Sequence, residues 1–118
     1  LKVRHILVVG HYGCGGVHAA VHNKTSSMVD HWLHPIRETA REHQHELDQI
    51  EHDHDKLNRL CELNVIQQVR NVSRDVIVQS AWNRGQKISV HGWVYSLANG
   101  LVKDLDVTIR SVADAEKL

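Results

Sequence analysis

The order of hydrophobic and polar positions divides the chain into strand-like and helix-like segments. Val3 to Val9 is a short apolar run rich in β-branched residues that ends at Gly10. Such a run is typical of a fully buried strand in a parallel sheet. Late in the chain, apolar and polar residues alternate from Lys87 to Tyr95, and Asn99-Gly100 is a strong hairpin signal. A second alternating run follows this turn, at Leu105, Val107 and Ile109.

Between these strands, apolar residues recur at three- and four-residue steps, which predicts helices. In the best-defined helix they form one stripe: Leu57, Leu60, Cys61, Val65, Val69 and Val72. The His-Asp-His-Asp segment at 52–55 is expected to cap it. A short helix is expected over Val17–His22, with Val17, Ala20 and Val21 facing inward. Another is expected over about Asp75–Arg84, ending at Gly85, a residue favoured just beyond helix ends.

A longer helix is expected from Met28 to about Ile50, after a loop at 23–27. Its apolar positions are Trp32, Leu33, Ile36, Ala40 and Leu47, so much of its surface should be exposed. Pro35 should either kink it or mark its first turn. The polar tail from Ser111 is expected to begin a further helix. The resulting class is α/β: a partly parallel sheet with an antiparallel C-terminal edge hairpin, flanked by helices.

Composition narrows the class of protein. With 118 residues the chain is large enough for one domain, which we assign to 1–118. Lys+Arg and Asp+Glu both total 14, so the broad basic field of a nucleic-acid-binding protein is missing. The apolar runs are too short to span a bilayer and none resembles a signal peptide, so no membrane partner is expected. Two cysteines, Cys14 and Cys61, suit a reducing compartment, which favours a cytoplasmic protein.

The most informative chemistry lies directly after the first strand. His11 and Cys14 are three residues apart on a glycine-rich turn, at the edge where open α/β sheets place their ligands. Imidazole and thiolate are both zinc ligands, and this spacing lets one loop offer two of them to one ion. The alternative is an ordinary turn cysteine beside a hydrogen-bonded histidine. Spacing alone leaves both interpretations open.

The run His11-Tyr12-Gly13-Cys14-Gly15-Gly16-Val17 resembles the zinc-binding loop of β-class carbonic anhydrases. Further blocks agree with that family in order and spacing, and together they cover nearly the whole chain. They are Leu60 to Val65 with Gln68 to Asn71, Ala81 to Gly85, Val90 to Tyr95, and Gly100-Leu101 with Lys103 to Leu105.

The resemblance implies a Zn²⁺ cofactor held by two cysteines and one histidine, with a fourth position open to water or closed by an aspartate. Zinc lowers the pKa of its bound water to about 7, which generates hydroxide at neutral pH. The implied activity is the reversible hydration of carbon dioxide to bicarbonate and a proton, in a homodimer or homotetramer. His11 and Cys14 match the second half of the ligand set.

The chain departs from the family in lacking the Cys-x-Asp-x-Arg segment, which supplies the other ligand cysteine and the residues that orient the bound water. Cys61 lies on the inner stripe of a helix, so we expect a buried, inert thiol. Since the chain also begins at Leu1 and enters a strand almost at once, we expect it to be the C-terminal part of a longer enzyme. Alone, it is expected to bind zinc weakly and to turn over little carbon dioxide.

Tyr95 matches a position that in some β-class members contributes to a second, non-catalytic bicarbonate site. The alternative is that Tyr95 packs in the sheet with its hydroxyl satisfied. Trp82 and Trp93 are expected in core or subunit contacts.

The 11 histidines raise the separate question of whether they bind metal ions. Most are expected to be solvated side chains, including the close pairs His18/His22, His43/His45 and His52/His54. Two other functions remain open. One is a non-catalytic remnant that keeps the fold as a structural or interaction domain. The other is a metal buffer that uses the histidines from His31 to His54.

Overall fold

The computed structural model describes residues 2–22 and 28–118. It contains three strands: β1 (His5–His11), β2 (Ser89–Tyr95) and β3 (Val102–Ile109). The sheet order is β1-β2-β3, with β1 parallel to β2 and β2 antiparallel to β3. The predicted α/β class is therefore confirmed, as is the antiparallel hairpin at the C-terminal edge. The loop predicted at 23–27 lies outside the described residues.

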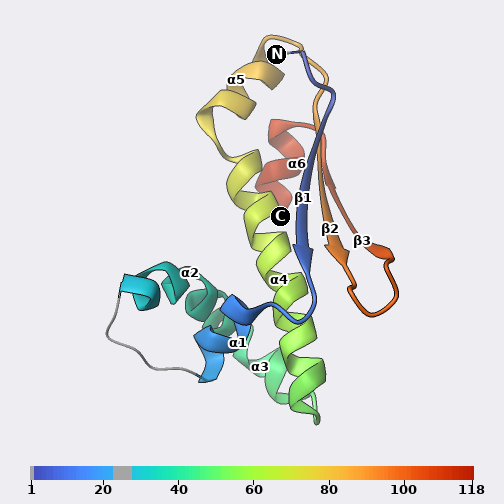
Figure 1. Cartoon of the computed structure of the whole chain (residues 1–118). Coiled ribbons are helices and arrows are strands. Elements are labelled where there is room, and N and C mark those ends of the chain that lie inside the picture. Colours follow the sequence, from blue (N-terminus) through green and yellow to red (C-terminus); the bar gives the residue numbers. More distant parts are fainter. Residues whose placement is uncertain (1, 23–27) are drawn as a thin grey trace.

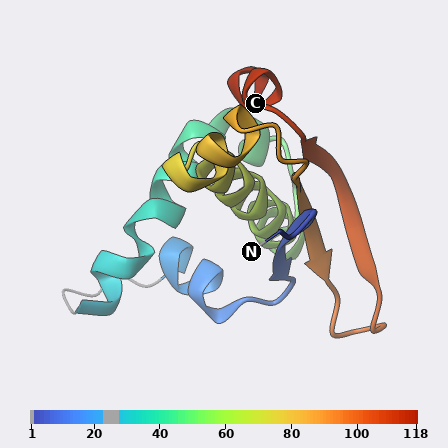
Figure 2. The same cartoon turned by 90° about the horizontal axis from the view of Figure 1, so that it is seen from above.

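The helices lie on one side of this sheet (Figures 1 and 2). In chain order they are α1 (Gly15–His22), α2 (Met28–Glu42), α3 (Gln44–Asp48), α4 (Asp53–Ser73), α5 (Val76–Asn83) and α6 (Val112–Lys117). In the part of the chain that the structure describes, no helix is both long and apolar enough to cross a bilayer.

The long helix α4 joins two hydrophobic clusters. Toward its C-terminal end, Val65 and Val69 pack with Val90 and Val94 of β2. Toward its N-terminal end, Leu60, Cys61 and Leu63 pack with Val17 of α1 and Leu47 of α3. The predicted stripe is confirmed, because Leu60, Cys61, Val65 and Val69 are buried while Leu57 and Val72 at its ends are half-buried. This helix therefore holds the sheet and the smaller helices together.

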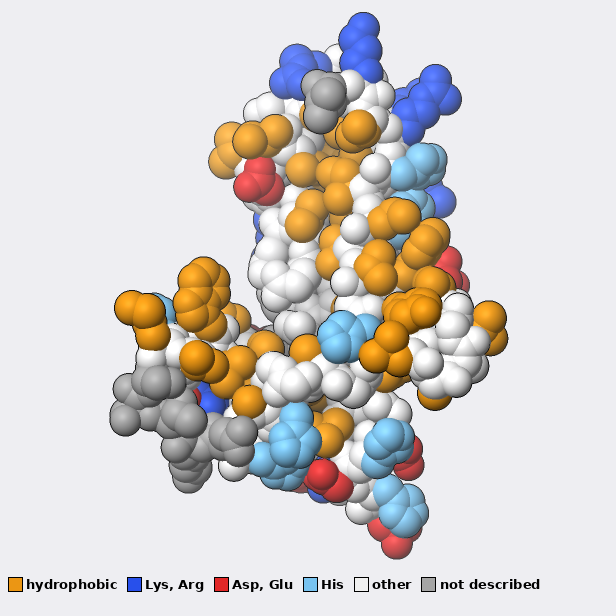
Figure 3. Space-filling view, in the orientation of Figure 1, with side chains coloured by type: hydrophobic (Ala, Val, Ile, Leu, Met, Phe, Trp, Pro, Cys, Tyr) orange, Lys and Arg blue, Asp and Glu red, His pale blue; other side chains and the backbone are white. Residues whose placement is uncertain are grey.

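The prediction that the first strand is fully buried is wrong. Along β1, exposed and half-buried residues alternate, and the side chains of Leu7 and Val9 are 47% and 52% exposed. The cause is that α4 covers one face of the sheet, whereas no helix among the described residues covers the other. Figure 3, in the orientation of Figure 1, shows apolar side chains gathered on the near side of the molecule, in the region of β1. The strand also begins at His5 instead of Val3.

Two other helix predictions need correction. The segment from Met28 to Ile50 forms two helices separated at His43, and Pro35 lies inside the first of them. Trp32 is 79% exposed, because only a narrow face of α2, centred on Leu33, contacts the body of the protein. In α1, Val17 and Ala20 are buried as predicted, but Val21 is 47% exposed, because a helix this short buries only its i, i+3 face.

The remaining predicted helices and strands are confirmed, but the side chain of His52, the N-cap of α4, makes no capping hydrogen bond. Helix α5 is capped by Asp75, whose carboxylate accepts a hydrogen bond from Ile77 N at 2.8 Å. It ends just before Gly85, which has a φ of 83°. The predicted turn at Asn99-Gly100 connects β2 to β3, and the tail forms α6 with Ser111 as its N-cap.

Candidate metal half-site at the end of β1

The candidate site is the loop that leaves β1 and enters α1. The strand ends at His11, and Cys14 immediately precedes α1, where its carbonyl accepts the hydrogen bond of His18 N at 3.0 Å. Gly13 has a φ of 70°, a left-handed conformation that glycine adopts without strain. The sharp turn between the two candidate ligands thus depends on this glycine. The loop lies at the carboxyl ends of two parallel strands, as the sequence predicted.

The imidazole of His11 is exposed, and its Nδ1 lies 2.9 Å from the carbonyl oxygen of Tyr12. A carbonyl oxygen can only accept a hydrogen bond, so Nδ1 carries the proton in this contact. The lone pair of the neutral ring is then on Nε2, the atom that remains available to a metal. Metal-binding histidines are commonly oriented in this way, by a hydrogen bond from the other ring nitrogen.

Cys14 is half-buried and lines an open cavity of about 330 Å³ together with His18, His54 and Cys61. Cys61 lies beneath the loop and is only 4% exposed. Burial raises the pKa of the Cys61 thiol, against a smaller lowering effect of the Cys14 backbone N–H. Cys61 therefore remains a protonated thiol at neutral pH, which fits the predicted inert role.

The structure brings His11 and Tyr95 together, because they are register partners at the ends of β1 and β2. The Tyr95 carbonyl accepts a hydrogen bond from Tyr12 N at 3.0 Å, and its side chain is half-buried. Over residues 2–22 and 28–118, however, no group of three or more His, Cys, Asp or Glu side chains could hold a metal ion. His11 and Cys14 offer nitrogen and sulfur donors that fit zinc. They are therefore candidates for two ligands of a metal, in a part of the chain where the described residues supply no group of three.

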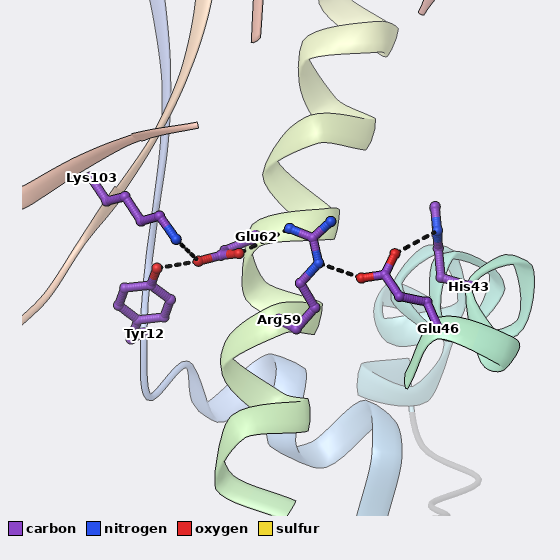
Figure 4. Close-up of polar contacts among 6 residues, drawn as sticks. All are labelled: Tyr12, His43, Glu46, Arg59, Glu62 and Lys103. Carbon is purple, nitrogen blue, oxygen red and sulfur yellow. Dashed lines mark hydrogen bonds and ion pairs between the residues drawn. The ribbon is translucent and has the colours of Figure 1, made fainter. Parts of the chain in front are cut away.

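A buried carboxylate next to this loop was not found by sequence reasoning. Glu62 on α4 is only 8% exposed and accepts a hydrogen bond from the Tyr12 hydroxyl. It also lies 3.0 Å from Arg59 Nη1 and 3.0 Å from Lys103 Nζ (Figure 4). A signal was present in the sequence, because Glu62 precedes Val65 and Val69 by three and seven residues and so shares their buried face.

These contacts shift two pKa values in opposite directions. Burial alone would raise the pKa of the Glu62 carboxyl, but hydrogen bonds from Tyr12, Lys103 and Arg59 lower it overall. Burial, followed by the hydrogen bond to Glu62, raises the pKa of Tyr12 to about 12. At neutral pH, Glu62 is therefore a carboxylate and Tyr12 a neutral phenol that donates to it.

The other histidines lie mostly at the surface, as predicted. His18 and His22 are exposed with their ring centroids 4.7 Å apart, and His22 Nε2 lies 3.2 Å from Asp53 Oδ2. His45, His52 and His54 are exposed as well. Two histidines are half-buried. His43 lies 4.0 Å from a carboxylate oxygen of Glu46, and His91 Nδ1 lies 3.0 Å from Thr108 Oγ1.

The two tryptophans singled out in the sequence are partly buried. Trp82 packs against the larger core cluster and donates a hydrogen bond from Nε1 to the Ile88 carbonyl at 2.9 Å. Trp93 has a buried indole N–H without a hydrogen-bond partner among the described residues. The predicted core contact is therefore confirmed for Trp82.

Comparison with known proteins identifies the family. The sequence model of the family described as carbonic anhydrase matches residues 1–102, which is most of the chain. The chain belongs to the carbonic anhydrase family. A curated carbonic anhydrase from Emericella nidulans is 44% identical over 119 residues, which span all of this chain and 52% of the relative. A carbonic anhydrase from Candida albicans is 32% identical over 91% of this chain and 38% of its own length.

Solved structures confirm the resemblance to the β class. A Coccomyxa β-carbonic anhydrase in complex with acetazolamide superposes with a TM-score of 0.89 at 43% identity, covering all of this chain and 54% of its own. A tetrameric β-carbonic anhydrase from Sordaria macrospora gives a TM-score of 0.81 at 29% identity, covering 92% of this chain and 55% of its own. The chain thus spans about half the length of the relatives it matches.

Proposed function

We propose that this chain is part of a zinc-dependent enzyme that reversibly hydrates carbon dioxide to bicarbonate and a proton. His11 and Cys14 would supply two zinc ligands, His11 through Nε2 and Cys14 through its thiolate. The observation that carries the proposal is the hydrogen bond from His11 Nδ1 to the Tyr12 carbonyl, on a loop within the family match. When bound, zinc supplies a water of lowered pKa, which can attack carbon dioxide as hydroxide.

The chain's own residues have defined tasks in this proposal. Tyr12 orients the imidazole of His11, and Gly13 forms the turn that leads from His11 to Cys14. The cavity beside Cys14 gives small molecules access to the site. Since the described residues offer two ligands and zinc takes three or four from protein, the chain alone should bind zinc weakly and show little turnover.

The experiment compares zinc stoichiometry and carbon dioxide hydration in the 118-residue chain and in His11→Ala, Cys14→Ser and His45→Ala variants. We expect His11→Ala and Cys14→Ser to lose the bound zinc, and His45→Ala, an exposed histidine of α3, to keep it. Equal zinc binding by all four proteins would refute the proposed ligands. Tight one-to-one zinc with high turnover in the wild-type chain would refute the proposed half-site.

The lack of a group of three donors among the described residues supports a second candidate, a non-catalytic domain that keeps the fold. This candidate predicts that zinc neither binds at His11 and Cys14 nor changes the stability of the chain. A metal buffer built on His31 to His54 predicts several zinc ions per chain, which would survive the His11→Ala substitution.

The remaining assignments are proposals of the same kind. We assign residues 1–118 to one domain with the β-carbonic anhydrase fold, and the free thiols Cys14 and Cys61 favour a cytoplasmic location. The Sordaria relative is tetrameric, which supports a homodimer or homotetramer. Tyr95 would contribute to a non-catalytic bicarbonate site, and its pairing with His11 across the two strand ends supports a position close to the metal loop. Bicarbonate titration of a Tyr95→Phe variant tests this assignment.

A further inference from the structure

Tyr12, the residue between the strand end and the Gly13 turn, is held at three points. Its backbone N–H donates to the Tyr95 carbonyl at 3.0 Å, and its own carbonyl accepts from His11 Nδ1 at 2.9 Å. Its side-chain hydroxyl donates to the carboxylate of Glu62 on α4. The carbonyl that orients the His11 imidazole therefore belongs to a residue whose backbone is tied to β2 and whose side chain is tied to α4.

Glu62 is itself fixed in place. Its side chain is only 10% exposed, and a carboxylate in that position is stable only when it is paired and hydrogen-bonded. Three donors meet this need from three segments of the chain: Tyr12 after β1, Arg59 one turn earlier on α4, and Lys103 on β3. Figure 4 shows the carboxylate between Lys103 and Tyr12 on one side and Arg59 on the other.

The anchoring extends to a further helix. Arg59 Nε donates to a carboxylate oxygen of Glu46 on α3 at 2.5 Å, while its Nη1 reaches Glu62. Glu46 does not approach Tyr12 in the described structure, so it belongs to the ion-pair network without touching the loop. The network therefore contains one carboxylate that contacts the loop and one that does not, and the two can be compared.

We propose that Glu62 is a positioning residue for the metal half-site, acting through the Tyr12 hydroxyl to hold the carbonyl that orients His11. The inference rests on the proposed function, in which His11 binds the metal through Nε2. The three fixed points of Tyr12 carry it, because a tyrosine free to move would let its carbonyl turn away from His11. Outer residues that orient metal ligands commonly change metal affinity about 10- to 100-fold when they are removed.

The test uses three new variants of the chain, beside the His11→Ala variant described above. Tyr12→Phe removes only the hydroxyl. Glu62→Gln replaces the carboxylate that accepts the hydrogen bond of this hydroxyl with a neutral amide. Glu46→Gln is the matched control, since it makes the same chemical change at the far end of the network, where an exposed ion pair contributes little. Circular dichroism identifies the variants that fold. If Glu62→Gln does not fold, Tyr12→Phe decides the outcome.

Two measurements report on the position of His11. The first is the dissociation constant for Co²⁺, followed through its thiolate absorption. We expect it to rise about tenfold in Tyr12→Phe and Glu62→Gln and to stay near the wild-type value in Glu46→Gln. The second is the ¹⁵N spectrum of the metal-free His11 ring at about pH 8.5, where an ordinary imidazole is neutral. We expect the Nδ1–H tautomer in the wild type and in Glu46→Gln, and a mixture of tautomers in the other two variants.

The outcomes separate this inference from the proposed function. Folded Tyr12→Phe and Glu62→Gln proteins that keep the wild-type Co²⁺ affinity and the Nδ1–H tautomer would overturn the inference. An equal loss of affinity in Glu46→Gln would also overturn it. The loss would then result from removing a negative charge from the network and not from releasing Tyr12. If His11→Ala binds Co²⁺ as well as the wild type does, the proposed function fails instead.

Discussion

Replacing Gly10 with alanine should destabilise the protein, because β1 lies close against α4 at this residue. An ideal Cβ at Gly10 would lie 2.5 Å from Val65 Cγ2, whereas non-bonded carbon atoms pack at about 3.5–4.0 Å. Val65 is 3% exposed in the main core cluster, so its methyl group has little room to move. The strand and the helix would have to separate by roughly 1 Å, and overpacking of this kind costs about 1–3 kcal/mol.

The assay is equilibrium urea denaturation, read from the midpoint at constant slope. Gly15→Ala is the matched control five residues along the chain, because a Cβ there meets no atom within 4 Å among the residues that the structure describes. Gly15 is the first residue of α1, and alanine is more favourable than glycine in a helix by up to about 1 kcal/mol. We therefore expect Gly10→Ala to lower the midpoint and Gly15→Ala to leave it unchanged or raise it.

A double-mutant cycle tests the cause of the loss. Val65→Ala should cost roughly 2 kcal/mol by itself, through lost apolar burial and the cavity left behind. In that background, Gly10→Ala no longer meets Cγ2 and should cost much less, so the two effects should not add. The reasoning is refuted if Gly10→Ala is as stable as the wild type, or if its loss adds in full to that of Val65→Ala.

Three further predictions concern titration, thiol reactivity and capping. Because the folded state raises the pKa of Tyr12 from about 10 to about 12, the stability that it contributes is complete below pH 10 and lost as the pH rises toward 12. Alkaline denaturation should therefore be shallower in Tyr12→Phe. Cys61 is buried and Cys14 half-buried, so in the metal-free native chain iodoacetamide should modify Cys14 first and Cys61 only on unfolding, as measured by peptide mass spectrometry. Asp75→Ala should lower the free energy of unfolding by about 1 kcal/mol in urea denaturation, because Ile77 N loses its cap.

Each of these three predictions would be contradicted by a specific result. Identical alkaline transitions in the wild type and Tyr12→Phe would contradict the raised tyrosine pKa. Modification of Cys61 at the rate of Cys14 would contradict its burial beneath the loop. For the cap, Asp75→Asn is the control, since asparagine also caps helices, and an equal loss in both variants would contradict the capping role.

Most of the fold could be predicted from the sequence, because each helix, strand and turn is indicated by a pattern of residues within its own segment. The stripe of α4 repeats from Leu57 to Val72. Gly85 marks the end of a helix and Asn99-Gly100 marks a hairpin turn, and both signals can be read from the sequence alone. The errors lie where burial depends on what covers an element. An apolar run such as Ile6 to Val9 predicts a strand, but only the position of α4 shows that one face of that strand is exposed.

The candidate site was predicted in part for a similar reason. His11 and Cys14 are three residues apart, so their loop can be recognised from local spacing and from the family resemblance. Their geometry depends on Tyr12, and Tyr12 depends on Glu62, a contact between residues 50 positions apart. Nothing local in the sequence connects those two residues. A carboxylate within an apolar helix stripe does indicate a buried partner, but it does not say which one.

The sequence distances within the Glu62 network have a consequence for the order of folding. The carboxylate joins residues 50 positions earlier and 41 positions later in the chain, and such contacts close large loops at an entropic cost. Helix α4 can begin to form from local contacts, whereas the loop between His11 and Cys14 gains its anchor only after the hairpin and the first strand have docked. We therefore expect the loop between His11 and Cys14 to become ordered among the last parts of the domain. If these residues bind a metal as proposed, a metal added to the unfolded chain would meet both of them in place only late in folding.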